Sequence, residues 1–459
     1  MEDFKISDKM KNLRYKTWTC LLLAVLGSSC RKYVEVDQYS NRTLKYTSDF
    51  QYVINNRNNF EPSYILPTVT SDDIATTGTA QQNAWNSEYK AAYVWAAGFY
   101  GDTQTDIGWN NFYKTIYTCN EVIFSVMSSE NGTKVQKDQI YAEALVNRAF
   151  AYLMLVNQYG EIYDPAKATT QIGVPLLTTP DLYQKLNRAS LSDVYGQIVK
   201  DVEQAIPLLP NTGNNNGHVG KVSAYALLSR CYLYMRNFAL AGDYADKALA
   251  LNSSLNNLTT YVGNMGKFPL RLNDPEVILS RLSAGQFRAQ LNPELINLFQ
   301  AGDLRLELFT GTGVQGIPGR VYIRPNFNEG YIYTGLNVPE MMLNRAEVYA
   351  RAGDIPKTLD LLNKLRQSRF TAVTYQDLSI SNPADLLPAV INERRRELMA
   401  TGLRWFDMRR LNLDAALAKP VVRTFLGQDY TLNPGSNRYL YPIAPAVLNL
   451  NPEIQQSPR

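Results

Sequence analysis

Few side chains in this sequence have the types and spacing that catalysis needs. The only histidine, His218, lies in a loop of glycine and asparagine with no evident carboxylate or nucleophile beside it, and we interpret it as a satisfied surface side chain. The adjacent residues Asp72 and Asp73 suggest a glycosidase pair, but adjacency alone does not hold two carboxyl groups about 5 to 9 Å apart across a substrate. A turn or capping role is therefore favoured for them. With four cysteines and no G-x-S-x-G or phosphate-binding glycine motif, the sequence predicts no enzyme, no cofactor and no metal site.

Side chains that bind sugars are better represented. Sugar rings present flat C–H faces on which aromatic rings stack, while amides and carboxylates bond the hydroxyl groups. Two segments without sustained helical periodicity, 68–108 and 253–333, hold such side chains. The candidate ligand-binding residues are Trp85, Tyr89 and Trp95 in the first segment, and Tyr322, Phe327 and Tyr331 in the second.

Each of these aromatic residues could instead belong to the core. Trp95 is the strongest case, because Tyr93, Trp95 and Phe99 also fit a buried strand or helix. If Trp85 and Tyr89 do stack on a sugar, alanine at either position should weaken glycan binding without lowering the melting temperature.

An arginine-rich segment near the C-terminus has two interpretations. Three consecutive arginines, Arg394–Arg396, could bind phosphate, but Glu393 and Glu397 flank them and apolar residues follow. A structural helix with guanidinium–carboxylate pairs is favoured, and Trp405 is expected in the core.

The composition is that of a folded globular protein, with 45% hydrophobic and 19% charged residues. A net charge of only +4 cannot supply the counterion release that drives binding to nucleic acid, so we exclude nucleic acid as a partner.

The N-terminus has the order of a secretory signal: a basic segment Lys11–Lys16, an apolar segment Trp18–Leu26, the small residues Gly27–Ser29, and then Cys30. The apolar segment is too short to span a bilayer core of about 30 Å as a helix. A cysteine at this place suggests a bacterial lipoprotein that is cleaved before Cys30 and acylated there. Ordinary cleavage near Ser29 with an unmodified Cys30 is the alternative, and Met10 is an alternative start.

The other two cysteines of the mature chain are Cys119 and Cys231. They are either two buried free thiols or one disulfide.

Apolar residues recur at helical spacing in several long segments. The spacing predicts one helix from Ile140 to Tyr159, closed by Gly160, and another over Leu191–Leu209. Lys221–Leu251 has the length and small-residue pattern of a tetratricopeptide-like hairpin with its turn at Arg236-Asn237. A second hairpin is expected over Glu340–Arg369, and a further helix pair around Trp109–Val126.

Taken in order, several motifs resemble those of the SusD/RagB family of outer-membrane lipoproteins from the Bacteroidetes. The most specific is Glu393–Leu398 (ERRREL) followed by Arg404–Arg410 (RWFDMRR). The others are Arg31–Glu35, Ser71–Asp73, Trp109 with Tyr113, Glu143-Ala144 with Arg148-Ala149, Tyr159-Gly160, Gly173–Leu176, Asp303 with Arg305, Arg345–Glu347 and Tyr441–Ile443.

The resemblance implies a lipid-anchored protein on the outer face of the outer membrane, with no enzymatic activity. Such a protein captures an oligosaccharide and delivers it to a SusC-like TonB-dependent transporter; some relatives take peptides instead. It places the ligand site in variable inserts, so no contact residue transfers by position. A lipid-anchored tetratricopeptide-type scaffold without a small-molecule ligand, and a glycan hydrolase, are the hypotheses that compete with it.

We therefore expect a mostly α fold: tetratricopeptide-like helical hairpins with irregular, loop-rich inserts and a few short strands. The expected regions are a signal peptide (1–29), a tether (30–50), a helical region (51–252) that contains the first insert (68–108), a ligand-lobe insert (253–333) and a C-terminal region (334–459).

Overall fold

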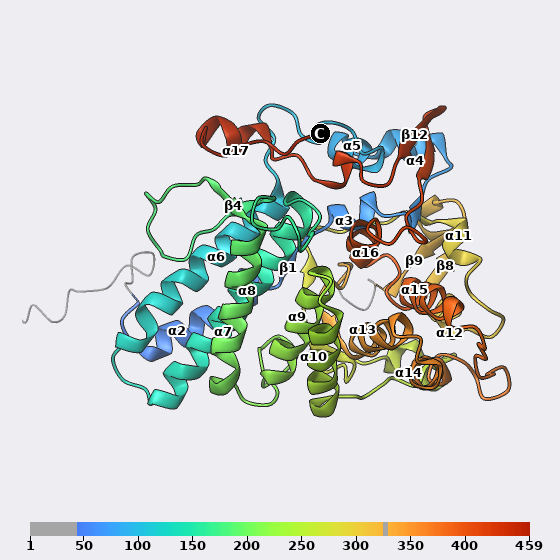
Figure 1. Cartoon of the computed structure of the whole chain (residues 1–459), viewed down its shortest axis with the longest axis horizontal. Coiled ribbons are helices and arrows are strands. Elements are labelled where there is room, and N and C mark those ends of the chain that lie inside the picture. Colours follow the sequence, from blue (N-terminus) through green and yellow to red (C-terminus); the bar gives the residue numbers. More distant parts are fainter. Residues whose placement is uncertain (1–43, 325–328) are drawn as a thin grey trace, which may run out of the picture. The chain divides into compact units, whose positions relative to one another are not determined.

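Helices make up most of the regular structure, as expected. The computed structural model describes residues 44–324 and 329–459, and every element named below belongs to the unit Tyr46–Arg459 (Figure 1). The signal segment 1–29 and Cys30 lie outside the described residues. The longer helices are α2 (Thr47–Asn55), α6 (Ile107–Ser125), α7 (Lys134–Tyr159), α8 (Leu191–Ala205), α9 (Lys221–Tyr234), α10 (Phe238–Leu251), α13 (Val338–Arg351), α14 (Ile355–Gln367), α15 (Leu386–Glu397) and α16 (Leu403–Leu411).

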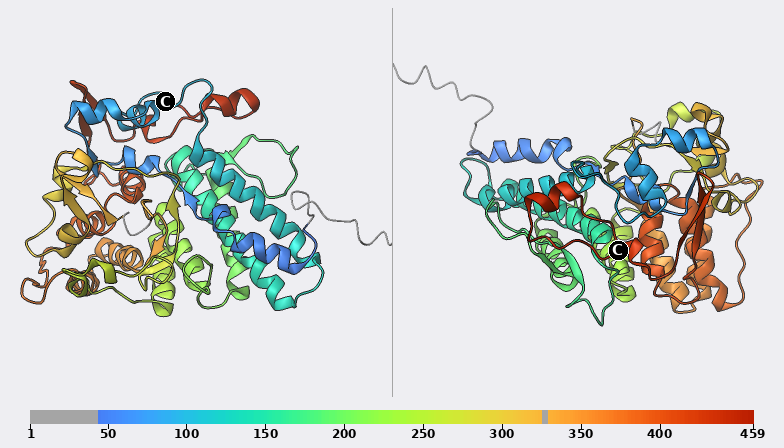
Figure 2. Two further views of the ribbon diagram at one scale, coloured as in Figure 1. Left: turned by 180° about the vertical axis from the view of Figure 1, so that it is seen from behind. Right: turned by 90° about the horizontal axis from the view of Figure 1, so that it is seen from above.

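The two predicted hairpins are confirmed. Helices α9 and α10 pack together across a turn at Arg236-Asn237, and α13 and α14 do so across Gly353-Asp354. The stack is continuous, because α7 packs against both α6 and α8, α8 packs against α9, and α10 packs against α13 (Figures 1 and 2). The expected helix pair at Trp109–Val126 is wrong: this segment lies within the single helix α6 and its short 3-10 extension, and its partner is α7. Nineteen residues in one helix bury one apolar face against α7 without a turn of their own.

Local side chains set the ends of these helices. Thr133 and Gln136 form a capping box at the start of α7, and the side chain of Asp354 accepts from the Lys357 N–H at the start of α14. Gly353 has a φ of +73°, which favours glycine. Gly160 ends α7 as predicted, but with extended backbone. A Cβ there would lie 2.7 Å from the Val156 carbonyl oxygen, so close packing requires this glycine.

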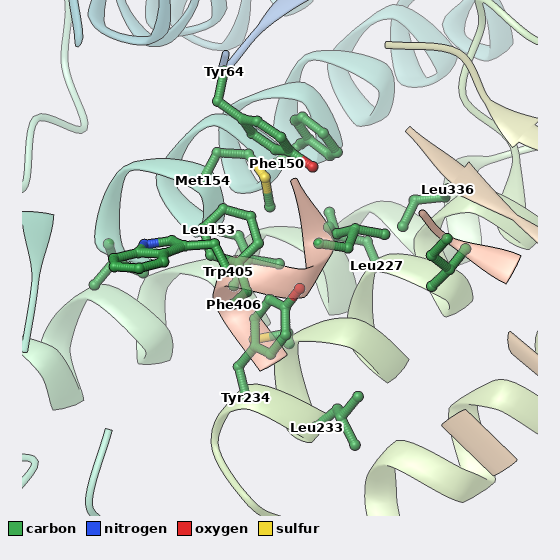
Figure 3. Packing of buried hydrophobic residues seen from close by; sticks show 14 of the residues in the cluster. Tyr64, Phe150, Leu153, Met154, Leu227, Leu233, Tyr234, Leu336, Trp405 and Phe406 are labelled. Carbon is green, nitrogen blue, oxygen red and sulfur yellow. The ribbon is translucent and has the colours of Figure 1, made fainter. Parts of the chain in front are cut away.

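Aromatic residues from distant segments meet in the core (Figure 3). Trp405 of α16 is fully buried, as predicted, and its ring stacks on Tyr439 and Tyr441 with centroids 5.2 and 5.8 Å away. The neighbouring Phe406 contacts the rings of Tyr64 and Tyr234. The apolar face of α16 therefore holds the N-terminal, central and C-terminal parts of the unit together.

Buried ion pairs also join the helices, and the structural interpretation of the arginine-rich helix is confirmed. Arg394 pairs with Asp407 at 2.7 Å and Arg395 with Asp73 at 2.9 Å, while Arg396 pairs with the flanking Glu393. The first two partners come from other elements, which the sequence pattern did not indicate.

Asp72 and Asp73 lie in a turn, as expected, but their side chains also form ion pairs with arginines of distant segments, which the sequence did not indicate. Asp72 accepts from Arg404 at 2.6 and 2.8 Å, and the second oxygen of Asp73 accepts from the Ala400 N–H. Both carboxylates are buried, and Arg404 and Arg395 hold the pKa of Asp72 well below its usual range although burial opposes this.

Short strands bring the two irregular segments together. The first contains α3 (Leu66–Thr70), β2 (Ile74–Ala75), α4 (Thr79–Ala84) and α5 (Ser87–Tyr93). Strand β2 pairs with β7 (Gln290–Leu291) of the second segment, in a sheet ordered β2-β7-β9-β8 that includes β8 (Thr310–Thr312) and β9 (Arg320–Tyr322). The remaining strands are β1 (Pro62–Ser63), β3 (Ile172–Pro175), β4 (Arg188–Ser190), β5 (Val277–Leu279), β6 (Leu282–Ser283), β10 (Leu336–Asn337), β11 (Val421–Phe425) and β12 (Gln428–Leu432). The other helices are α11 (Pro293–Ile296), α12 (Leu304–Leu308) and α17 (Pro445–Leu450).

The C-terminal hairpin β11–β12 completes this part of the fold. It lies beside α4 and α5 in Figures 1 and 2, where the Leu426 N–H donates to the side chain of Gln82 at 2.9 Å. Cys119 and Cys231 are both buried free thiols, one of the two alternatives left open. No helix among the described residues is long and apolar enough to cross a membrane. The five expected regions of the chain remain a prediction.

Candidate functional site

Trp85 and Tyr89 lie together at the junction of two short helices. Trp85 directly follows α4, and Tyr89 is in the first turn of α5, where the side chain of Asn86 accepts from the Tyr89 N–H at 2.7 Å. Both rings contact Phe287 of the second segment, with centroid distances of 5.6 and 5.2 Å. The strand pairing between the two segments thus places three aromatic residues in one group.

Two buried aromatic rings pack against the core side of this group. Tyr93 and Phe425 are almost fully buried, and each contacts Trp85, at 5.2 and 6.3 Å between centroids. Trp85 and Tyr89 themselves are only partly buried, and both retain accessible surface. We call these five residues the aromatic cluster. Its arrangement, with accessible rings held by a rigid base, is suited to stacking on an apolar face of a ligand.

Amide side chains near the cluster mostly serve the fold. Gln82 donates to the Thr76 carbonyl oxygen and accepts from Leu426, and Asn86 caps α5. Asn83 is exposed. Hydrogen bonds to a polar ligand would therefore come chiefly from elsewhere.

A polar pocket of about 310 Å³ supplies such groups, and it contains the candidate Tyr331. Two charged pairs of side chains and two amides face it: Arg57, Glu61, Arg271 and Glu329, with Asn58 and Asn111. Arg271 and Glu61 are paired at 2.8 Å, which fixes the carboxylate and the guanidinium in the pocket wall. We call this cavity the Tyr331 pocket.

One short segment connects the pocket to the aromatic cluster. Leu282, Ser283 and Ala284 line the Tyr331 pocket, and Phe287 belongs to the cluster. Between them, a Cβ built on Gly285 would lie 3.8 Å from the Tyr89 hydroxyl. The structure therefore places Trp85, Tyr89 and Tyr331 along the segment Leu282–Phe287.

Two other candidates are buried. Trp95 is 3% exposed; its indole N–H donates to the Thr70 carbonyl oxygen at 3.0 Å, and the guanidinium of Arg423 lies 4.5 Å from its ring. Tyr322, in β9, is 8% exposed. Neither ring offers a ligand an open face, so we leave both out of the proposed site. Phe327 lies outside the described residues.

Glu88 adds a titratable group beside Tyr89. Burial raises the pKa of Glu88 to about 7, and the nearby Asp106 adds to the effect. Gln104 donates to this carboxyl group at 3.3 Å. Nothing in the sequence distinguished Glu88 from other exposed-looking acidic residues, because its burial depends on the loop that contains Gln104.

His218 is a satisfied, partly exposed side chain, as interpreted, but it has a carboxylate partner that the sequence did not show. Its Nδ1 lies 3.0 Å from Oε1 of Glu143 in α7, and the hydrogen bond to Glu143 raises the pKa of His218. The partner is 75 residues away in the sequence. The Tyr331 pocket was also missed as a unit, because four of its polar residues come from three separate places in the chain: Asn58 with Glu61, then Asn111, then Arg271.

Comparisons with known proteins agree with the fold. A family model described as "Starch-binding associating with outer membrane" matches residues 32–233, and one described as "SusD family" matches residues 338–459. The SusD-like protein P38 of Formosa agariphila is 22% identical to this chain, over 98% of this chain and 99% of that protein.

Solved structures with this fold include a SusD superfamily protein from Bacteroides thetaiotaomicron. It has a TM-score of 0.75 and 21% identity, covering 90% of this chain and 100% of that chain. A putative sugar binding protein from Bacteroides vulgatus has a TM-score of 0.72 and 20% identity, with 91% and 99% covered. A laminarin-binding SusD-like protein has a TM-score of 0.65 and 18% identity, with 90% and 99% covered.

Proposed function

Because the chain belongs to the SusD/RagB family, we propose that it is a cell-surface binding protein that captures an oligosaccharide and delivers it to a SusC-like TonB-dependent transporter. On this proposal the protein is held on the outer face of the outer membrane by lipid on Cys30, and it performs no chemistry on its ligand. Energy for transport comes from the partner.

The aromatic cluster with the adjoining Tyr331 pocket is the observation that carries the proposal. Trp85 and Tyr89 supply accessible ring surface, and the pocket supplies amide, carboxylate and guanidinium groups that bond hydroxyls. The combination is suited to a sugar chain, whose residues present both C–H faces and hydroxyl groups. The laminarin-binding relative supports the choice of a glycan as the ligand class.

Calorimetry with the purified mature protein tests the proposal. The panel contains laminarin, starch and xylan oligosaccharides and a mixture of neutral peptides. We expect one glycan class to bind and the peptides not to bind. Binding of peptides alone would favour a RagB-like peptide carrier, and no binding at all would favour the scaffold hypothesis. Release of reducing sugar by the protein alone would contradict the proposal that it is not an enzyme.

Alanine variants locate the site. Tyr89→Ala and Tyr331→Ala should each weaken glycan binding by about 5-fold or more, since loss of one aromatic stacking contact costs about 1 kcal/mol or more. Trp85→Ala should weaken binding and also lower the melting temperature, because Trp85 packs on Tyr93, Phe287 and Phe425. From the sequence alone, the melting temperature of Trp85→Ala was expected to stay unchanged.

The matched control is Tyr183→Ala. Tyr183 is 95% exposed, in the loop between β3 and β4, and outside both the cluster and the pocket. Its loss should leave affinity unchanged. Unchanged affinity in both Tyr89→Ala and Tyr331→Ala would contradict the site, whatever the protein binds.

A further inference from the structure

A second cavity lies apart from the proposed glycan site, between α15, α16 and the segment that follows α16. Its volume is about 220 Å³, and Asp72, Arg395, Arg404, Asn412 and Lys419 supply its polar wall. Neither the aromatic cluster nor the Tyr331 pocket shares a residue with it. The glycan proposal makes no use of this cavity.

Two buried arginines in the wall are only partly used by the protein. Arg404 donates through Nε and Nη2 to Asp72, at 2.6 and 2.8 Å. Arg395 donates through Nε to Asp73 at 2.9 Å and through Nη2 to the Asp72 carbonyl oxygen at 2.8 Å. The side chain of Arg404 is 11% exposed and that of Arg395 is 6% exposed. Among the described residues no acceptor is found for Nη1 of either arginine, and neither atom is sealed inside protein.

Two further polar side chains line the cavity, Asn412 and Lys419. The side-chain nitrogen of Asn412 is buried beside Tyr439, which also lines the cavity. Lys419 is largely exposed and has its nearest carboxylate, Glu294, at 4.0 Å. Asp72 and Asp73 already bond Arg404 and Arg395, so the positively charged atoms left open to a ligand are Nη1 of these two arginines.

Apart from Asn392 and Tyr439, the rest of the wall is apolar. Ile391, Met408 and Leu417 line the cavity together with Pro388 and Val421. A hydrated inorganic anion would leave this surface uncovered. A ligand that fills the cavity would need one anionic end and a hydrocarbon body.

We propose that this cavity binds a small organic carboxylate. The carboxylate accepts from Nη1 of Arg395 and Nη1 of Arg404, and its apolar body packs against Ile391, Met408 and Leu417. Charge-assisted bonds from arginine to carboxylate are among the stronger polar contacts in proteins.

Calorimetry and saturation-transfer NMR on the purified mature chain test this proposal with benzoate and butyrate, each beside its neutral alcohol. We expect the acids to bind at least about 10-fold more tightly than benzyl alcohol and butanol. Ala416 is exposed and lines the mouth of the cavity, so Ala416→Trp should abolish binding of the acids. Ala415→Trp is the control, because Ala415 is equally exposed and does not line the cavity.

Several outcomes would overturn the proposal. These are no detectable binding of either acid at millimolar concentration, equal affinity for acids and alcohols, equal or tighter binding of inorganic phosphate, and unchanged binding of the acids in Ala416→Trp. Melting temperatures of both tryptophan variants show whether a loss reflects unfolding. Because Ala416 belongs to neither the aromatic cluster nor the Tyr331 pocket, glycan affinity should be the same in Ala416→Trp, so the two proposals succeed or fail independently.

Discussion

His218 and Glu143 form a pH-sensitive pair between the loop before α9 and helix α7. Because the bond to Glu143 raises the pKa of His218 above its ordinary 6.5, the folded protein holds the imidazolium more tightly than the unfolded chain does. The stabilisation is fully present below pH 6.5 and is lost as the pH rises through the pKa of the folded state.

We expect His218→Gln to be less stable than the wild type at pH 6 and equal to it at high pH. The pair is partly exposed, so the difference should stay under about 1 kcal/mol. Urea unfolding at a series of pH values measures it. Glu143→Gln should flatten the same pH dependence. A stability difference between the wild type and His218→Gln that grows toward high pH would contradict the pairing of His218 with Glu143.

Arg230 and Glu340 form a fully buried ion pair between α9 and α13. Arg230 donates to both carboxylate oxygens, at 2.7 and 2.6 Å, and neither side chain is exposed. Removing one charge leaves the other without compensation in the core.

We therefore expect Glu340→Gln to lower the free energy of unfolding by about 3 to 5 kcal/mol. Asp138→Asn, which breaks the exposed pair of Lys134 and Asp138, is the control and should cost under about 1 kcal/mol. Denaturant unfolding compares the two. Equal effects would show that the buried pair does not hold the helices together.

At the scale of elements, Gly196 is a weak point in α8. It is an exposed helical residue, and a Cβ there would meet no atom within 4 Å. Glycine in a helix interior costs about 1 kcal/mol relative to alanine, because it loses more backbone freedom on folding.

Gly196→Ala should therefore stabilise the protein by about 0.5 to 1 kcal/mol, measured by urea unfolding. Gly335→Ala should have the opposite sign, since its Cβ would lie 1.9 Å from the Leu279 carbonyl oxygen beside the β10–β5 pair. A stabilising Gly335→Ala would contradict the packing described for these strands.

The helical hairpins were predictable because their information is local. Apolar spacing, the Arg236-Asn237 and Gly353-Asp354 turns and the closing Gly160 lie within a few residues of what they determine. The length of α6 was misjudged because one long amphipathic helix and a pair of short helices present similar spacing. The two-residue strands β2 and β7 carry no periodicity that a sequence could reveal.

At the scale of the whole molecule, the proposed role depends on an anchor at Cys30. We expect the mature protein to begin with Cys30 and to carry more than one acyl chain there. Several chains are expected because a single chain gives only marginal attachment to a bilayer. Mass spectrometry of the N-terminal peptide from the membrane fraction measures this. The N-terminal peptide of the Cys30→Ser variant should lack the added mass. In cells that do not make the transporter, this variant should no longer be found in the membrane fraction. An unmodified N-terminus near Ser29 would contradict the anchor.

The sequence by itself determined the helical class, the hairpins, the structural role of the arginine-rich helix, the core position of Trp405 and the resemblance to the SusD/RagB family. Only the tertiary structure decided which aromatic rings remain accessible, which buried charges meet and where cavities lie. The physical reason is the distance along the chain over which each interaction acts. Helix periodicity and capping act within a few residues, whereas Trp85 meets Phe287, His218 meets Glu143, and Asp73 meets Arg395 only after the chain has folded.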